Sequence, residues 1–195
     1  MSNILITGAT GSLGQSLVPA FLQRGDNVTI LSRDPHKQAT LLGKYQQFHA
    51  ILGDIYVLDS MFGACEGQDI VVHAAANKRI ERGDTDTREY HRVNVLGTLN
   101  VAEACRLNSV EKALFIGSDK EVAASSVYGL TKAIGSHIWL AEQTPYNITK
   151  FSCVRYGNVV ESNGSVWHVW QERVRQGLPL LVREPEPTRF FLTMS

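Results

Sequence analysis

The sequence predicts an α/β protein with a doubly wound parallel sheet, the arrangement known as a Rossmann fold. Short apolar runs with strand character alternate along the chain with longer segments of helical period. A glycine-rich turn, Gly8 to Gly14, stands between the first apolar run and the first helical segment. Strands that alternate with helices form βαβ units, and right-handed crossovers then cover both faces of a parallel sheet with helices.

The expected elements follow in order along the chain. Each strand is a short apolar run, and each helix is the longer segment of helical period that comes next. The strands are expected at 3–7, 27–31, 47–52, 69–75, 112–118 and 148–156, and the helices at 12–23, 35–42, 58–64, 87–107, 127–142 and 166–175. Near the end, Pro185 and Pro187 exclude a continuing helix, and we expect no further element in the apolar run 190–194.

Length and composition favour one ordinary globular domain over residues 1–195. The chain has 44% hydrophobic and 19% charged residues, with 19 basic and 19 acidic side chains. A formal net charge of zero indicates neither nucleic-acid binding nor a solvating acidic tail. The three cysteines are far apart and lack the spacing of a zinc site or a disulfide framework. With no basic leader or membrane-length apolar run, we expect a cytoplasmic protein without a metal or a membrane partner.

The first glycine-rich turn is a candidate phosphate-binding loop. Gly8, Gly11 and Gly14 permit a tight turn and let backbone N–H groups approach a pyrophosphate at a helix N-terminus. The alternative is a tight βα turn without a ligand. The candidate cofactor-binding residues of this loop are Gly8, Thr10, Gly11, Ser12, Leu13 and Gly14.

The residues after the second strand favour NADP over NAD. Ser32, Arg33 and Lys37 offer a hydroxyl and cations to a 2′-phosphate, for which arginine has a planar fork of donors. The alternatives are that Arg33 and Lys37 merely solvate a helix start, and that Asp34 supports NAD. After the third strand, Asp54 can reach the adenine edge, and Ile55 follows it in the candidate cofactor site.

A Tyr-x-x-x-Lys pair is the candidate acid–base group. Tyr128 and Lys132 share one face of a helix, where an ammonium can lower the phenol pKa. Such a phenol could act on a sugar or alcohol hydroxyl, and Ser118 at the end of the fifth strand could hold the same oxygen. By itself the pair is more typical of an ordinary surface helix. The strand-end serine and the phosphate loop favour the catalytic interpretation.

At this point the sequence resembles a known family. The segments "TGATGSLG", "GDI", "HAAANK", "RVNVLGTLNV", "SDK", "YGLTK", "VRYGNVVESNGSV" and "TRFFLT" occur in order over nearly the whole chain. Together they resemble the extended short-chain dehydrogenase/reductase superfamily and, more narrowly, the inverting UDP-N-acetylglucosamine 4,6-dehydratases. The combination of "SDK", "RYGNVV" and "TRFF" is more specific than any single motif.

The resemblance implies a role for each residue of the cluster. Tyr128 would take the proton of the sugar C4 hydroxyl while hydride passes to NADP, and Lys120 would then take the C5 proton. Asp119 would protonate the departing C6 hydroxyl. Ser118 would polarise the C4 oxygen, and Lys132 would orient the nicotinamide ribose and tune Tyr128. The alternative for Asp119 and Lys120 is a solvated charge pair at a strand end.

Other residues receive milder roles by the same resemblance. In "HAAANK" the residues Ala74, Ala75, Ala76 and Lys78 would line the cofactor site, whereas His73 is more typical of a buried core histidine. Asn94 would lie in the helix that backs the active site. The remaining assignments are Tyr128, Lys132, Tyr156 and Asn158 for the cofactor and Lys78, Asn158 and Arg189 for the nucleotide sugar, expected to be a UDP-sugar.

The sequence also departs from the family. Glu161 and Asn163 stand where relatives tend to carry Gly and Arg, which leaves the sugar nucleotide open. The resemblance also implies a further substrate lobe, of which residues from about 160 to 195 would be a remnant. Subunit contacts would then complete the pocket, so we expect a homo-oligomer with contacts at 151–156 and 178–195.

Two rival functions stay open. A nucleotide-sugar 4-epimerase or reductase needs Tyr128 and Lys132 but no base for the C5 proton, which is the role that the resemblance gives to Lys120. A non-catalytic NADP-binding module or sensor would account for the small size of the substrate lobe.

Overall fold

The computed structural model describes residues 1–160, 162, 165–180, 182, 186 and 188–193. Glu161 and Asn163, and parts of the predicted contact segment 178–195, lie outside the described residues. The chain divides into two compact units, Met1–Arg155 and Tyr156–Ser195. Each unit is described by itself below.

The first unit is built on one parallel sheet of six strands in the order β3-β2-β1-β4-β5-β6. This order confirms the predicted doubly wound α/β fold. The crevice at the carboxyl ends of β1 and β4, where the strand order reverses, is where such folds bind ligands. The strands are β1 (Asn3–Thr7), β2 (Asn27–Ser32), β3 (Phe48–Leu52), β4 (Ile70–His73), β5 (Lys112–Ile116) and β6 (Lys150–Val154).

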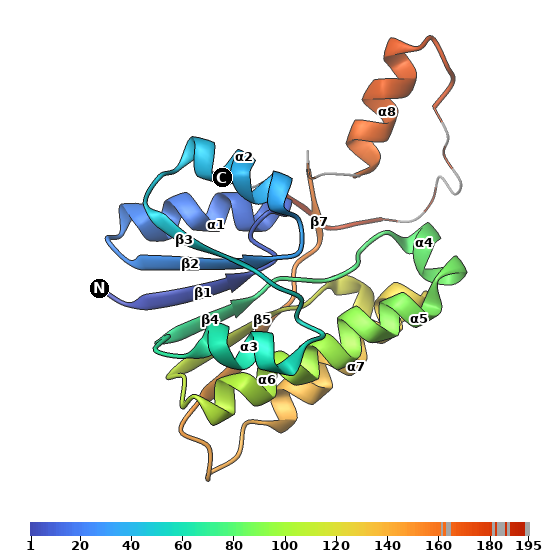
Figure 1. Cartoon of the computed structure of the whole chain (residues 1–195). Helices are drawn as coiled ribbons and strands as arrows, with labels where there is room; N and C mark the ends of the chain where they lie inside the picture. Colours follow the sequence, from blue (N-terminus) through green and yellow to red (C-terminus); the bar gives the residue numbers. More distant parts are fainter. Residues whose placement is uncertain (161, 163–164, 181, 183–185, 187, 194–195) are drawn as a thin grey trace. The chain divides into compact units, whose positions relative to one another are not determined.

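Helices cover both faces of this sheet. Figure 1 shows α1 and α2 on one face and α3, α6 and α7 on the other. Asp34 caps α2 by accepting a hydrogen bond from the backbone N–H of Lys37, at 3.0 Å. The longer helices of this unit are α1 (Ser12–Gln23), α2 (Pro35–Lys44), α3 (Leu58–Cys65), α6 (Gly97–Leu107) and α7 (Val127–Ala141).

The helix predicted over 87–107 is confirmed in its bounds, because the segment is helical throughout, but the change to a π-helical pitch in its middle was not predicted. The segment consists of α5 (Thr87–Tyr90), the π-helical turn η1 (His91–Leu96) and α6. The side-chain amide of Asn94 in η1 bonds the backbone of Asn77, so a tertiary contact accompanies the change of helical pitch. A short helix before this segment, α4 (Ile80–Thr85), was not predicted either.

A large hydrophobic cluster of the first unit lies between the sheet and the helices α3, α6 and α7. Trp139 of α7 is fully buried and stacks on His73 with ring centroids 5.5 Å apart. Phe115 and Phe151, from β5 and β6, complete this aromatic cluster. The cluster holds α7 against β4, β5 and β6, which fixes the helix that carries the Tyr-x-x-x-Lys pair.

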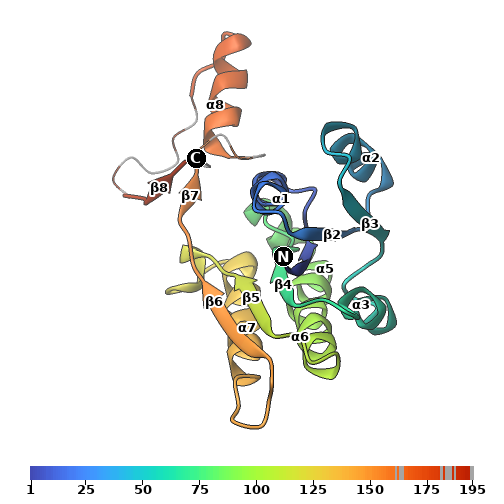
Figure 2. The ribbon, with the colours of Figure 1, turned by 90° about the vertical axis from the view of Figure 1, so that its left-hand side faces the viewer.

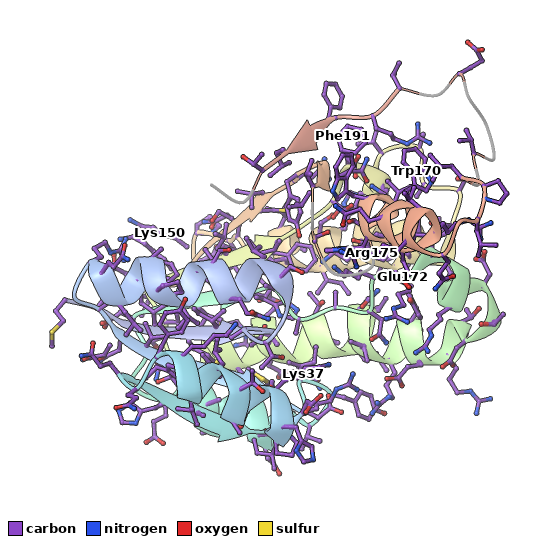
Figure 3. The ribbon with its side chains drawn as sticks, turned by 90° about the horizontal axis from the view of Figure 1, so that it is seen from above. Lys37, Lys150, Trp170, Glu172, Arg175 and Phe191 are labelled. Atoms are coloured by element: carbon purple, nitrogen blue, oxygen red, sulfur yellow. The ribbon has the colours of Figure 1, made fainter. Side chains whose placement is uncertain are left out.

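The described residues of the second unit form a short parallel pair of strands and one helix (Figure 2). They are β7 (Asn158–Val159), β8 (Phe191–Leu192) and α8 (Val166–Arg175). The expectation of no element in 190–194 was wrong, because β8 lies in this segment. It forms by pairing with β7, in which Asn158 lies opposite Phe191, 33 positions later in the chain. Figure 3 labels Trp170, Glu172 and Arg175 on α8.

No side chain of α8 is buried, and its apolar residues lie at the surface of this unit. A groove on this unit is lined by Trp167, Trp170, Gln171, Val174, Arg175 and Leu180. Within the described part of the chain, no helix has the length and apolar character needed to cross a membrane. The expected homo-oligomer stays a prediction.

Candidate active site

The glycine-rich loop leaves no space for side chains at two of its glycines. Gly8 has a φ of +74°, and a Cβ on it would lie 2.6 Å from the backbone nitrogen of Ala75. A Cβ on Gly14 would lie 2.3 Å from the Cα of Ala9. The loop therefore packs tightly on the turn after β4. The N-cap residue of α1 is Gly11, which has no side chain that could cap the helix, and an anion can be accommodated at such a helix start.

A buried hydrogen-bond chain joins β1 to the turn after β4. The hydroxyl of Thr7 lies 2.7 Å from Nδ1 of His73, and Nε2 of His73 lies 3.1 Å from the hydroxyl of Thr98. Thr7 also accepts a hydrogen bond from the backbone N–H of Ala75. Burial lowers the pKa of His73 to about 3, with a smaller contribution from the charge of Lys132. The expectation of a core histidine is confirmed, and this chain fixes the alanine turn beside Gly8.

Charged side chains gather where β2 and β3 end. Nη1 of Arg33 lies 3.3 Å from Glu89 and 3.6 Å from Asp54. Arg92 contacts the same two carboxylates, at 2.7 Å for Glu89 and 3.6 Å for Asp54. Nearby in sequence, Lys37 pairs with Asp34 at 3.2 Å.

Ser32 and Ile55 lie beside these charges in the chain. The hydroxyl of Ser32 is buried and has no hydrogen-bond partner among the described residues. The side chain of Ile55 is buried in the core, where its methylene and methyl carbons would meet a Cβ on Gly97. An unsatisfied buried hydroxyl, a tight glycine loop and an uncapped helix start together fit an adenine dinucleotide.

The predicted acid and base form one ion pair just after β5. Nζ of Lys120 lies 2.8 Å from Oδ1 of Asp119, and both side chains are a little over one quarter exposed. The hydroxyl of Ser118 lies 3.2 Å from the same carboxylate oxygen. The pair lies on η2 (Asp119–Glu121), a single 3₁₀ turn. The structure thus brings Ser118, Asp119 and Lys120 together as a polar cluster that a substrate can reach.

Glu121 holds this turn in place, and sequence analysis missed it. Its Oε1 atom accepts a hydrogen bond from the backbone N–H of Ser118 at 2.7 Å, and its Oε2 atom contacts Nε of Arg155 at 2.7 Å. Together with the hydroxyl of Ser118, which accepts from the N–H of Lys120, this makes a capping box. The spacing Ser-x-x-Glu from Ser118 to Glu121 is the signal that could have identified it.

Lys132 is a buried cation beneath the end of β5. Its Nζ atom donates a 2.7 Å hydrogen bond to the carbonyl of Ile116 and lies 3.9 Å from the centroid of the Phe115 ring. Burial lowers the pKa of Lys132 to about 8, although the charges of Glu121 and Cys153 act in the opposite direction. Tyr128 lies one helical turn before Lys132 on α7 and is partly exposed.

The start of α7 packs directly on the Asp119–Lys120 turn. A Cβ on Gly129 would lie 2.3 Å from the carbonyl oxygen of Lys120. Ser126 caps the helix by accepting a hydrogen bond from the backbone N–H of Gly129, at 3.1 Å. Because Tyr128 precedes Gly129, this close contact keeps the phenol-bearing turn next to the ion pair.

Asn94 links the turn after β4 to α7. Asn94 is buried, accepts from the N–H of Asn77 at 2.8 Å and donates to the hydroxyl of Thr131 at 3.1 Å. This supports its expected place behind the active site. Lys78 follows on the same turn, and desolvation together with the charge of Arg79 lowers its pKa.

The predicted site residues divide between the two units. Most of them, including the glycine loop, lie in the first unit, at the carboxyl ends of its strands. Tyr156, Asn158 and Arg189 lie in the second unit, where Asn158 is part of β7 and Arg189 donates to the carbonyl of Thr188. Their roles stay predictions. Glu89 and Arg92 were not predicted, because no local motif connects them to Arg33.

The fold and these residues define a class of protein, the dinucleotide-binding domain of the short-chain dehydrogenases/reductases. A family model described as "Polysaccharide biosynthesis protein" matches residues 4–195. The chain belongs to this family, an extended branch of that superfamily, as the resemblance implied.

Two curated relatives match almost the whole chain. The "UDP-N-acetylglucosamine 4,6-dehydratase (inverting)" of Campylobacter jejuni strain 81-176 is 32% identical over 99% of this chain and 60% of its own length. The "UDP-glucose 4-epimerase" of Rickettsia bellii strain RML369-C is 32% identical over 98% of this chain and 59% of its own length. The chain therefore spans about three fifths of these relatives.

Solved structures share the fold. Pen from Bacillus thuringiensis has 30% identity and a TM-score of 0.94, over 99% of this chain and 63% of that one. MoeE5, solved in complex with UDP-glucose and NAD, has 24% identity and a TM-score of 0.85, over 98% of this chain and 68% of that one. The match to Pen spans both units of the chain.

Proposed function

We propose that the protein acts in NADP-dependent 4,6-dehydration of a nucleotide sugar resembling UDP-N-acetylglucosamine. The observation that carries the proposal is the 2.8 Å contact between Lys120 and Asp119 beside the hydroxyl of Ser118. A redox reaction at C4 alone uses a phenol and a lysine. Elimination across C5 and C6 also needs a base and an acid, and this pair supplies one of each.

The relatives support this class of reaction. One relative is named a UDP-N-acetylglucosamine 4,6-dehydratase, and MoeE5 binds UDP-glucose and NAD. For this chain we propose NADP, held at its pyrophosphate by the Gly8–Gly14 loop and near its 2′-phosphate by Ser32 and Arg33. The unpaired buried hydroxyl of Ser32 supports that placement. When bound, the dinucleotide would supply the hydride acceptor for C4 and the hydride donor for C6.

The first step is removal of the proton from the C4 hydroxyl. Tyr128 takes this proton, and Ser118 holds the C4 oxygen. The buried ammonium of Lys132, one helical turn from Tyr128, stabilises the phenolate by its charge. The resulting C4 ketone makes the C5 proton more acidic.

The second step uses the ion pair. In the structure Lys120 is the donor and Asp119 the acceptor. One proton transfer along this hydrogen bond gives a neutral amine and a carboxylic acid, the two forms that the elimination requires. A bound sugar that excludes water from the pair favours this neutral form, because charge separation is costly at low dielectric. Lys120 then takes the C5 proton and Asp119 protonates the departing C6 hydroxyl. Lys120 finally returns a proton to C5.

A 4-epimerase is the second candidate, because a relative of equal identity is named a UDP-glucose 4-epimerase. Epimerisation would use Tyr128, Lys132 and Ser118 and leave the ion pair without a chemical role. A third candidate, a dinucleotide-binding module without turnover, predicts cofactor binding without a product.

Mass spectrometry together with proton NMR of the products distinguishes these candidates, because mass reports the loss of water and NMR reports the configuration at C4. The protein is incubated with NADP and UDP-N-acetylglucosamine, and a product lighter by one water supports the dehydratase. An unchanged mass with an inverted C4 centre supports the epimerase, and bound cofactor without a product supports the module. Lys120→Ala should abolish the loss of water, whereas Lys112→Ala, which removes an exposed lysine paired with Glu111, should not. A Lys120→Ala protein that eliminates water at the parent rate contradicts the assigned base.

A further inference from the structure

Glu89 contacts the arginine that the proposed NADP site depends on. Its Oε1 atom accepts, at 3.3 Å, the only hydrogen bond that Arg33 donates within the described part of the chain. Nη1 of Arg33 also lies 3.6 Å from Asp54. The guanidinium therefore has two carboxylates on one of its nitrogens and keeps other N–H groups for a ligand.

Arg92 fixes the orientation of Glu89. Its Nε atom donates to Oε2 of Glu89 at 2.7 Å and its Nη2 atom donates to Oε1 at 3.1 Å, a two-point contact. Arg92 itself is held over the ring of Tyr56, 4.9 Å from the centroid. The hydrogen bond from Arg92 is the largest cause that lowers the pKa of Glu89; burial opposes it, and the hydrogen bond from Arg33 lowers the pKa further. Glu89 thus remains charged and in place at neutral pH.

The balance of charge at this edge of the sheet is even. Two arginines, Arg33 and Arg92, face two carboxylates, Asp54 and Glu89. A 2′-phosphate that approaches Arg33 would also approach the carboxylate of Glu89. The hydroxyl of Ser32, one residue before Arg33, is buried and has no hydrogen-bond partner among the described residues.

We propose that Glu89 is a specificity-determining residue, which offsets the charge of Arg33 and so weakens the preference of the site for a 2′-phosphate over a 2′-hydroxyl. The proposal rests on the proposed binding of a dinucleotide in this crevice. It assigns the discrimination between NADP and NAD to a residue on α5 that is 56 positions from Arg33.

The test compares dinucleotide affinities of the whole chain by isothermal titration calorimetry. Glu89→Gln keeps an oxygen that can accept from Arg33 and removes only the charge. We expect its dissociation constant for NADP to fall about tenfold and that for NAD to change less than about twofold. Glu103→Gln is the matched control, since Glu103 also pairs with an arginine three positions along a helix, Arg106, on α6. It should change neither constant.

A double-mutant cycle tests the route through Arg33. In an Arg33→Gln background, Glu89→Gln should no longer improve NADP binding, because the proposed effect of Glu89 acts through the charge of Arg33, which this background removes. Thermal melts confirm that each variant is folded. If NAD binds normally and Glu89→Gln leaves the ratio of NADP to NAD affinity unchanged, Glu89 does not set specificity. If the parent chain and every folded variant bind neither dinucleotide, the proposed function fails, and this inference fails with it.

Discussion

Nζ of Lys132 donates a 2.7 Å hydrogen bond to the carbonyl oxygen of Ile116. This contact joins α7 to the last residue of β5, two positions before Ser118. The lysine of the Tyr-x-x-x-Lys pair is therefore a buried cation at the carboxyl end of β5, and it is not a solvated cation on a helix surface. A cation in this position raises the acidity of a neighbouring phenol more strongly than an exposed one, because little water screens it.

The burial of Lys132 predicts a stability change at high pH. Its pKa is about 8 in the folded chain, below the ordinary 10.5 expected for the unfolded chain. Between pH 8 and 10.5 the unfolded chain holds a proton on Lys132 that the folded chain has lost. The stability that comes from neutral, buried Lys132 is therefore fully present above pH 10.5 and is lost as the pH falls through 8. Relative to Lys132→Met, the parent should gain about 3 kcal/mol in the free energy of unfolding between pH 8 and 10.5. Urea unfolding of both proteins measures the difference, and a constant difference would disprove it.

The buried histidine predicts acid sensitivity. His73 has a pKa of about 3 in the folded chain and an ordinary value of 6.5 when unfolded. Its contribution to stability is present above pH 6.5 and is lost as the pH falls toward 3. We expect a loss of about 3 kcal/mol between pH 6.5 and 4 from this residue, absent in a folded His73→Gln variant. Proton NMR of the parent offers a check that needs no variant: a His73 ring that titrates near pH 6 would contradict the burial argument.

We predict that the packing of α7 at Gly129 is coupled to the dehydration activity. Gly129→Ala places a Cβ against the carbonyl of Lys120, so the Asp119–Lys120 turn must shift. We expect a loss of about 2 kcal/mol in stability and a larger loss of dehydration than of dinucleotide binding. The control is Gly63→Ala, at a helical glycine of α3 whose added Cβ would meet no atom within 4 Å. It should stabilise the protein by about 0.5 kcal/mol. Equal activity in the two variants would refute the coupling.

We predict that Gly8→Ala impairs dinucleotide binding by an effect that is separate from backbone strain. Both Gly8 and Gly25 have positive φ angles, +74° and +84°, but only Gly8 faces backbone atoms at close range. Alanine at either position should cost about 1 kcal/mol through strain alone. Gly8→Ala should also abolish dinucleotide binding in calorimetry, whereas Gly25→Ala should retain it. Retained binding by Gly8→Ala would remove the loop from the proposed site.

Much of the fold and part of the site could be predicted from local patterns. The alternation of strands and helices, the helix Ser12–Gln23 and the helix Val166–Arg175 follow from apolar periodicity and flanking turn residues. The site residues of β5 and α7 follow from motifs in which the reactive groups are near neighbours in the chain. Such features depend on backbone conformation over a few residues, so a sequence can encode them directly.

Tertiary structure alone decided which groups meet. The contact of Arg33 with Glu89 spans 56 positions and that of Glu121 with Arg155 spans 34. These distances close only when β2 pairs with β1 and β5 with β6 in one sheet. The π turn at 91–96 likewise accompanies the buried contacts of Asn94 with Asn77 and Thr131. The sequence by itself determined the order of elements and the reactive side chains, whereas the packing of the sheet decided their partners, burial and charge balance, because these depend on residues far apart in the chain.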